Sequence, residues 1–225
     1  MSPILEFEKN YLLGMYHPFF GCYMQQSPFA LVALNRLLNY YNFFNIIELG
    51  THDAGLSTFF ALYAKCSKMP PLDNPNEPCI IKNSSHHKTR KNFYTFDKFV
   101  RDRHQWELVQ SLGANIYCGD FLEDEDLKNF IAKIIKNPGP VLLLCDGDKV
   151  KEFNYYSNFL KEGDIIMCHD FAYDFSKAQE LKDKNLWYNH EVTWEFLKEP
   201  CSKNNIKQIH QDIFDDVAWF CGIKE

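Results

Sequence analysis

The stretch from Asn45 to Thr58, NIIELGTHDAGLST, decides the fold. A short apolar run ends in the acid Glu48, a turn bounded by Gly50 and Gly55 follows, and residues 56–65 have a helical pattern. Glycine has no Cβ and tolerates positive φ, so such a turn lets backbone N–H groups approach a ligand closely. Taken alone, the turn is equally well explained by a purely structural role, so the rest of the chain has to support a ligand site.

Four further apolar runs each end in a polar or acidic residue. These runs are Phe93–Phe96 before Asp97, Asn115–Cys118 before Gly119 and Asp120, Val141–Cys145 before Asp146, and Asp164–Cys168 before His169 and Asp170. Continuous apolar runs of this length fit parallel strands buried on both faces. Amphipathic segments of helix length separate them at 100–112, 122–135 and 150–160. This alternation predicts βαβ units and a parallel sheet, hence an α/β fold.

Acidic residues follow or end the predicted strands. Right-handed crossovers place the carboxyl ends of parallel strands at one edge of a sheet. We therefore expect five acids to converge on one crevice: Glu48, Asp97, Asp120, Asp146 and Asp170. This convergence is the main physical reason to expect an active site.

Composition narrows the class of protein. The chain has 225 residues, 46% of them hydrophobic, and a formal net charge of -6. This is enough for one α/β domain with a sizeable core, and the acidic balance argues against long nucleic-acid partners. No apolar run approaches the roughly 20 residues that cross a bilayer, so we expect no membrane span. The first ten residues lack the layout of a signal peptide.

The eight cysteines include no Cys-x-x-Cys pair, which argues against a zinc knuckle. Cys118, Cys145 and Cys168 end three predicted strands, where they are expected to be buried as small hydrophobic residues. Free buried thiols indicate a reducing compartment, the cytoplasm. A catalytic thiol at Cys145 or Cys168 is the alternative, although no pattern pairs either with a base.

The chain is predicted to be a single domain over 1–225. Residues 1–44 would form an N-terminal helical cap, in which Ser27 and Pro28 begin a helix over 29–41. Residues 66–92 form a loop insertion rich in proline, whose His86-His87 pair is either solvated or a metal ligand. A helix is expected over 188–198, and a terminal antiparallel hairpin over 206–213 and 217–222.

The crevice offers groups for a nucleotide-like cofactor. The turn from Gly50 to Gly55 would surround a small charged fragment of the ligand. Asp97 stands where such folds hold a ribose diol, since its two oxygens can accept from both hydroxyls. Asp120 could accept from an adenine amine, but a helix N-cap is an equally good explanation.

The ends of the last two parallel strands suggest metal chemistry. Asp146 and Asp170 would lie one strand apart, and an oxygen-rich site suits Mg²⁺. A bound Mg²⁺ would lower the pKa of a substrate hydroxyl. Lys149 would take the proton if its own pKa is depressed nearby, and the alternative is a solvated partner of Asp148.

Four motifs in combination resemble a known family. They are Glu48-Leu-Gly-Thr-x-x-x-Gly55, Thr95-Phe-Asp-Lys98, Cys145-Asp-Gly-Asp-Lys149 and Gly163-Asp-Ile-Ile-x-x-His169-Asp170. Over residues 21–222 the chain resembles a class I S-adenosylmethionine-dependent methyltransferase. It is most similar to the cephalosporin-hydroxylase-like group and its relatives among macrolide sugar O-methyltransferases, and the segment from Gln25 to Phe29 resembles that group as well.

The resemblance implies a Rossmann-like, doubly wound, mostly parallel seven-stranded sheet with a C-terminal antiparallel hairpin. It implies Mg²⁺-assisted methyl transfer from S-adenosylmethionine to a hydroxyl of a sugar, polysaccharide precursor or small metabolite. The implied cofactor-binding residues are Glu48, Gly50, Thr51, Gly55, Ser57, Asp97, Asp120 and Asp146. The implied metal ligands are Asp146, His169 and Asp170, and the implied catalytic residues are Lys149 and His169. Ala54 replaces a customary glycine, and His169 stands where an acid often precedes the second metal acid.

Three other functions stay open at this point. His169 could act as base without metal, and the chain could be a non-catalytic S-adenosylmethionine-binding subunit. A NAD-dependent dehydrogenase is disfavoured because Gly-x-Gly-x-x-Gly is absent at Gly50. Neither the acceptor nor association into a homo-oligomer follows from the sequence.

Overall fold

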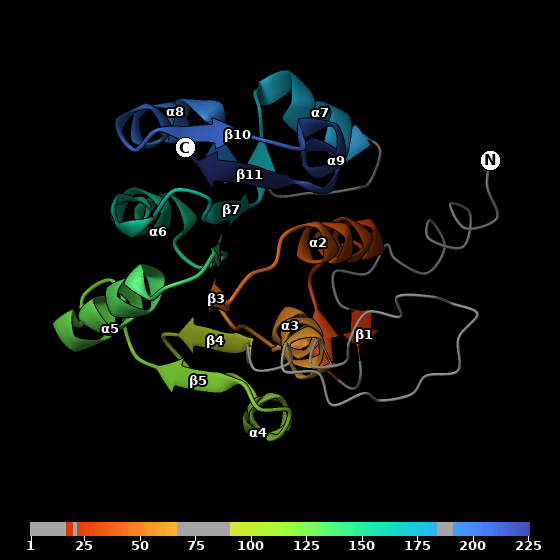
Figure 1. Cartoon of the computed structure of the whole chain (residues 1–225). Coiled ribbons are helices and arrows are strands. Elements are labelled where there is room, and N and C mark those ends of the chain that lie inside the picture. Colours follow the sequence, from red (N-terminus) through yellow and green to blue (C-terminus); the bar gives the residue numbers. More distant parts are fainter. Residues whose placement is uncertain (1–16, 20–21, 67–90, 184–190) are drawn as a thin grey trace, which may run out of the picture.

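The computed structural model describes residues 17–19, 22–66, 91–183 and 191–225. A seven-stranded sheet in the order β10-β11-β7-β6-β3-β4-β5 runs through its centre (Figure 1). Its strands are β3 (Asn45–Leu49), β4 (Asn92–Asp97), β5 (Asn115–Cys118), β6 (Val141–Cys145), β7 (Ile165–His169), β10 (Ile206–Gln208) and β11 (Trp219–Lys224). The neighbours from β7 to β5 are parallel, and only the contacts of β11 with β7 and β10 are antiparallel. The predicted Rossmann-like α/β fold is therefore confirmed.

Helices cover both faces of the sheet (Figure 1). One face packs against α2 (Pro28–Tyr40), α3 (Gly55–Cys66), α4 (Arg103–Ser111) and α9 (Gln211–Phe214). The other packs against α5 (Glu125–Lys136), α6 (Lys149–Tyr156) and α8 (Trp194–Lys203). Successive strand residues alternate between the two cores: Ile46 belongs to the first and Ile47 to the second. This double burial explains why the strands are continuously apolar in the sequence.

Smaller elements lie outside the seven-stranded sheet. The strands β1 (His17–Phe19) and β2 (Cys22–Met24) form an antiparallel pair. The two-residue strands β8 (Phe171–Ala172) and β9 (Val192–Thr193) pair in parallel, with α7 (Phe175–Asp183) between them in sequence. Two 3₁₀ helices, η2 (Ser157–Phe159) and η3 (Asp215–Val217), follow α6 and α9.

Capping side chains set where the helices begin. The Ser27 hydroxyl accepts a hydrogen bond from the Phe29 N–H at 3.2 Å, as expected for the start of α2. Asp102 and Asp124 cap α4 and α5 through their carboxylates. The predicted helices starting at 100 and 122 therefore begin three residues later than expected, because each cap has to precede the first helical turn.

Three local predictions were wrong. Residues 192–193 form β9 because they pair with β8, so the helix predicted over 188–198 begins at Trp194 instead. The terminal antiparallel hairpin is confirmed, but its first strand, expected over 206–213, ends at Gln208 as β10, and His210 adopts φ 53° before α9. Cys118 is exposed, because β5 is the outermost strand of the sheet, whereas Cys145 and Cys168 are buried.

Several predictions fall largely outside the described residues. These are the insertion over 66–92 with its histidine pair, the first part of the N-terminal cap and the segment 184–190. The single-domain boundary 1–225 stays a prediction. Among the described helices, none combines the length and apolar character that a bilayer crossing requires.

Candidate active site

A cavity of ≈ 630 Å³ opens at the carboxyl edge of the parallel strands. Its wall includes four of the five acids expected to converge there, Glu48, Asp97, Asp146 and Asp170. A cavity of this size is suited to a cofactor or small molecule. The fifth acid, Asp120, does not line it; its carboxylate accepts from the Leu122 N–H at 3.1 Å in the turn before α5 and pairs with Lys98. The helix-cap alternative is wrong as well, because Asp124 is the N-cap of α5.

The glycine turn brings backbone close to the end of β6. Gly50 has φ 104°, and a Cβ there would lie 2.7 Å from the carbonyl carbon of Asp146. A side chain at this position would displace the strand end that carries Asp146. Gly50, Thr51 and Gly55 all line the cavity, so the turn is placed where a ligand can contact its backbone.

Asp97 lines the same cavity and is held in place by two backbone N–H groups. Its Oδ2 accepts from the His52 N–H at 2.7 Å and its Oδ1 from the Phe99 N–H at 3.2 Å. A carboxylate oxygen can accept more than one hydrogen bond, so both oxygens keep capacity for a diol. The two N–H groups hold the carboxylate in one orientation.

Glu48 lies at the base of the cavity and is 1% exposed. Burial raises its pKa to about 8, against the hydrogen bonds from Ser57 and Thr95 that favour the charged form. The Thr95 hydroxyl donates to Oε2 at 2.6 Å, and the Ser57 hydroxyl donates to the same oxygen. Ser57 is fully buried behind Glu48 and is not part of the cavity wall.

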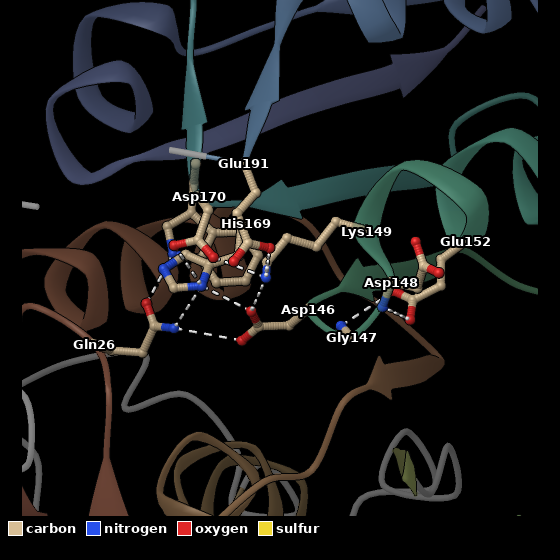
Figure 2. Close-up of polar contacts among 10 residues, drawn as sticks. Gln26, Asp146, Gly147, Asp148, Lys149, Glu152, His169, Asp170 and Glu191 are labelled. Atoms are coloured by element: carbon tan, nitrogen blue, oxygen red, sulfur yellow. Dashed lines mark hydrogen bonds and ion pairs between the residues drawn. The ribbon is translucent and has the colours of Figure 1, made fainter. Parts of the chain in front are cut away.

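The cavity wall also holds two paired carboxylates, Asp146 and Asp170. Figure 2 shows their contacts. The Nδ1 atom of His169 lies 2.7 Å from Oδ1 of Asp146. The Lys149 ammonium lies 2.7 Å from Oδ2 of Asp170 and 4.0 Å from Oδ1 of Asp146. These pairs come from the ends of the neighbouring strands β6 and β7, as the sequence predicted.

Lys149 does not have the depressed pKa expected of a base. Its burial lowers the pKa, but the negative charges of Asp146 and Asp170 outweigh burial and raise it above the ordinary lysine value. The ammonium also donates to Glu191 at 3.0 Å. The alternative pairing with Asp148 is wrong as well, because Lys151 makes that contact at 2.7 Å. Lys149 is therefore a structural cation in this site.

His169 is 3% exposed and lines the cavity. Burial lowers the pKa of its imidazole, and the charges of Asp146 and Asp170 outweigh burial and raise it. A contact of 2.7 Å to a carboxylate oxygen requires a proton on Nδ1. The His169–Asp146 pair thus has the geometry of a base with an orienting carboxylate.

The thiol alternative receives no support. Burial raises the pKa of both Cys145 and Cys168 well above the ordinary value. Neither thiol lines the cavity, and a nucleophilic cysteine needs a thiolate.

The donor set fits a divalent cation. One ligand atom from each of Asp146, His169 and Asp170 lies within 4.8 Å of the others. Within the described residues, Oδ1 of Asp170 is buried without a hydrogen-bond donor, although its partner oxygen contacts Lys149. A buried carboxylate oxygen of this kind favours a cation as partner.

Sequence reasoning missed the site residues Gln26 and Glu191. The Gln26 side chain reaches between Asp146 and His169 from the loop before α2 (Figure 2). Glu191 is placed by its own N–H, which donates to the Asp170 carbonyl at 3.0 Å, where Asp170 adopts φ 57°. The family-like segment around Gln26 was a usable signal, whereas nothing in the sequence marks Glu191.

Comparison with known proteins gives a likeness in structure alone. No family model matches the chain, and no curated protein matches it. A candidate O-methyltransferase from Nostoc punctiforme has 10% sequence identity and a TM-score of 0.53, with 87% of this chain and 56% of that chain covered. An O-methyltransferase family protein from Burkholderia thailandensis has 9% identity and a TM-score of 0.48, over the same shares of the two chains.

A SAM-dependent methyltransferase from Archaeoglobus fulgidus has 10% identity and a TM-score of 0.45, with 92% of this chain and 75% of that chain covered. The chain spans little more than half the length of the Nostoc protein, at 56%. The likeness to the Nostoc protein, with its TM-score of 0.53, shows that the chain shares the fold of a candidate O-methyltransferase.

Proposed function

We propose that this protein is an S-adenosylmethionine-dependent O-methyltransferase acting on a hydroxyl of a small molecule or a sugar. The observation that carries the proposal is one cavity whose wall contains both the glycine turn with Asp97 and the His169–Asp146 pair. The first set suits a nucleoside-like cofactor, and the second suits proton removal. The name of the structurally similar Nostoc protein agrees with this activity.

The cofactor would lie along the glycine turn. Backbone groups of Gly50, Thr51 and Gly55 would contact its amino-acid part, and Asp97 would accept from the ribose hydroxyls. Glu48 would support the turn from below in its neutral form. The proposal assigns Ser57 an indirect part, through its hydrogen bond to Glu48, and gives Asp120 no contact with the cofactor.

Methyl transfer forms a bond between the acceptor oxygen and the methyl carbon and breaks the bond between that carbon and the sulfonium sulfur. The acceptor hydroxyl loses its proton, and we assign this proton to Nε2 of His169, because Nδ1 already carries the proton donated to Asp146. The Asp146 carboxylate then stabilises the imidazolium. Lys149 keeps Asp170 and Glu191 in place and is not the base.

The proposal also includes assistance of methyl transfer by a bound Mg²⁺. Asp146 and Asp170 would hold the ion, with His169 as a third donor in reach. A bound Mg²⁺ would lower the pKa of the acceptor hydroxyl and orient it. The metal-free alternative is favoured by a separate observation: His169 and Lys149 already contact one oxygen of each carboxylate, so the protein itself offsets part of their charge.

The charges in the cavity indicate the class of acceptor. Asp146, Asp148, Asp170 and Glu191 line the cavity around Lys149, whereas the lining cations Lys98 and Arg101 come from the segment after β4. An excess of carboxylates attracts a sulfonium and repels a phosphate or carboxylate placed at the reacting position. The reacting part of the acceptor should therefore be a neutral polyhydroxyl or phenol.

Incubation with methyl-labelled S-adenosylmethionine and a panel of sugars, nucleotide-sugars and catechols tests this proposal. We expect label in a neutral hydroxylated acceptor. The assay is repeated with a chelator and then with excess Mg²⁺. Loss and recovery of turnover would support metal assistance, whereas full turnover in chelator would support His169 acting alone. Label on an amine, or none with any acceptor despite cofactor binding, would contradict O-methylation.

A further inference from the structure

A second layer of contacts surrounds the His169–Asp146 pair. The amide oxygen of Gln26 accepts from the indole N–H of Trp219 at 2.9 Å. Its amide nitrogen lies 3.5 Å from Oδ2 of Asp146 and 3.4 Å from Nδ1 of His169 (Figure 2). Gln26 is 5% exposed and Trp219 is fully buried, so the amide cannot reorient into solvent.

Trp219 also holds the imidazole directly. It lies opposite His169 in the register of β11 with β7, and the two rings stack with centroids 4.6 Å apart at an angle of 30°. One indole therefore touches His169 through its face and Gln26 through its N–H. The stack fixes the plane of the imidazole.

The direction of the Gln26 amide follows from hydrogen-bond chemistry. An indole N–H can only donate, so the amide group that faces it has to be the oxygen. The amide NH₂ must then face Asp146 and His169. A donor beside a carboxylate is favourable, whereas a donor beside a protonated Nδ1 is not, so the NH₂ group belongs to Oδ2 of Asp146. Oδ1 of Asp146 is then the oxygen that accepts the hydrogen bond from Nδ1 of His169.

We propose that Gln26, oriented by Trp219, is a positioning residue that holds Asp146 in the rotation that keeps the proton on Nδ1 of His169. This arrangement directs Nε2 toward proton transfer. The inference rests on the proposed base function of His169, but the tautomer that it specifies is measurable without any turnover.

Two variants remove different atoms of this chain of contacts. Gln26→Leu removes the whole amide, and Trp219→Phe keeps an aromatic ring against His169 but removes the N–H. Nitrogen-15 NMR of histidine-labelled protein in chelator reports the tautomer, with the His169 signal assigned through its loss in His169→Asn. We expect neutral His169 to carry its proton on Nδ1 in the unchanged protein and to become a mixture of tautomers in both variants.

Kinetics provide the second readout. Each variant should lower kcat by about 10- to 100-fold, the usual range for partners that orient a functional histidine. The affinity for S-adenosylmethionine should change less than about 2-fold, because neither residue belongs to the proposed cofactor site. The double variant should be no worse than either single one, since both break the same contact. Gln110→Leu on α4, an exposed glutamine, is the matched control and should match the unchanged protein.

The outcomes separate the inference from the proposed function. A proton on Nε2 in the unchanged protein, or an unaltered tautomer with unaltered kcat in a folded Gln26→Leu variant, would overturn the positioning inference. Altered tautomers in both variants of a protein that shows no methyl transfer would retain the positioning inference and refute the proposed reaction. Additive losses in the double variant would show that Trp219 and Gln26 act separately, which also overturns it.

Discussion

At the scale of single residues, Lys149 and His169 have different surroundings, and we therefore propose different functions for them. Lys149 contacts carboxylates on both sides and is 8% exposed, so its positive charge is stabilised. His169 lines the cavity, and its Nδ1 lies 2.7 Å from Asp146 and 3.6 Å from Asp170. Both lie near Asp146 and Asp170, and geometry rather than sequence spacing distinguishes them.

The first prediction compares substitutions of these two residues. His169→Asn should cut turnover by roughly 10²–10⁴-fold while the protein stays folded, because it removes the proposed general base. Lys149→Met should instead lower the free energy of unfolding by about 3–5 kcal/mol, since it leaves the buried Asp170 carboxylate without its cation. Chemical denaturation and assays under saturating cofactor measure the two effects. If Lys149→Met is stable but inactive and His169→Asn is active, Lys149 and not His169 is the base.

The second prediction concerns pH. The pKa of His169 is raised from its ordinary value of 6.5, because the charges of Asp146 and Asp170 outweigh burial. A base has to be neutral to act, so kcat should fall as pH drops through a pKa that lies above 6.5. The same shift stabilises the folded state at low pH and loses that contribution as pH rises through the folded pKa. Asp146→Asn should move the kinetic limb to lower pH; a limb that stays in place would exclude this charge as its cause.

The third prediction concerns the buried acid of β3. The pKa of Glu48 is raised from 4.5 to about 8 by burial. Between these two pH values the unfolded chain loses the proton while the folded chain keeps it, so stability falls as pH rises. A glutamine in its place would accept the same hydrogen bonds without ionising. The advantage of Glu48→Gln over the unchanged protein in unfolding free energy should therefore grow from pH 5 to pH 8, and a difference independent of pH would contradict the assignment.

At the scale of elements, the parallel core was predictable and the short paired segments were not. The strands β3, β6 and β7 are continuously apolar because both of their faces are covered, so each can be recognised from its own residues. The two-residue strand β9 exists only because Val192 pairs with Phe171, a contact between distant parts of the chain. Helix starts were misplaced where an aspartate cap, such as Asp102, lies inside an apparently periodic segment.

The same distinction applies to the site. Asp146 and His169 come from adjacent strand ends, so sheet topology alone brings them together. Gln26 and Glu191 reach the site from a loop and from a segment held by the Asp170 carbonyl. Their positions depend on tertiary contacts that no local pattern encodes. The pKa of Lys149 was wrongly predicted for a related reason: Glu191 and the close approach of Asp170 were not visible in the sequence.

The fourth prediction belongs to the contact between α3 and β2. A Cβ on Gly55 would lie 2.4 Å from the Met24 Cβ and from the Tyr23 carbonyl oxygen. Gly55→Ala should therefore cost about 1–3 kcal/mol of unfolding free energy through overpacking, and it should loosen the segment that carries Gln26. Lys65→Ala, at the exposed end of the same helix, is the control for helix propensity. If both variants are equally stable in thermal unfolding, β2 adjusts to the added methyl group without loss of stability, and the prediction is wrong.

At the scale of the whole molecule, the order of strands determines where chemistry can occur. The parallel strands β3, β4, β6 and β7 end at one edge, and the cavity lies there with polar side chains from each of them (Figure 1). The N-terminal segment with Gln26 and the segment with Glu191 add the remaining walls. The antiparallel β11 contributes Trp219 behind His169, so the last strand of the sheet takes part in the site as well.

The most direct test of this account is calorimetric titration of the purified protein with S-adenosylmethionine. We predict binding to a single site, with Asp97→Ala weakening it by on the order of 1.5–3 kcal/mol, the scale of hydrogen bonds to a charged group. His169→Asn should bind the cofactor as the unchanged protein does, because the proposed function assigns His169 to the acceptor and not to the cofactor. Absence of binding in the folded, unchanged protein, or equal affinity in the Asp97→Ala variant, would contradict the proposed cofactor site.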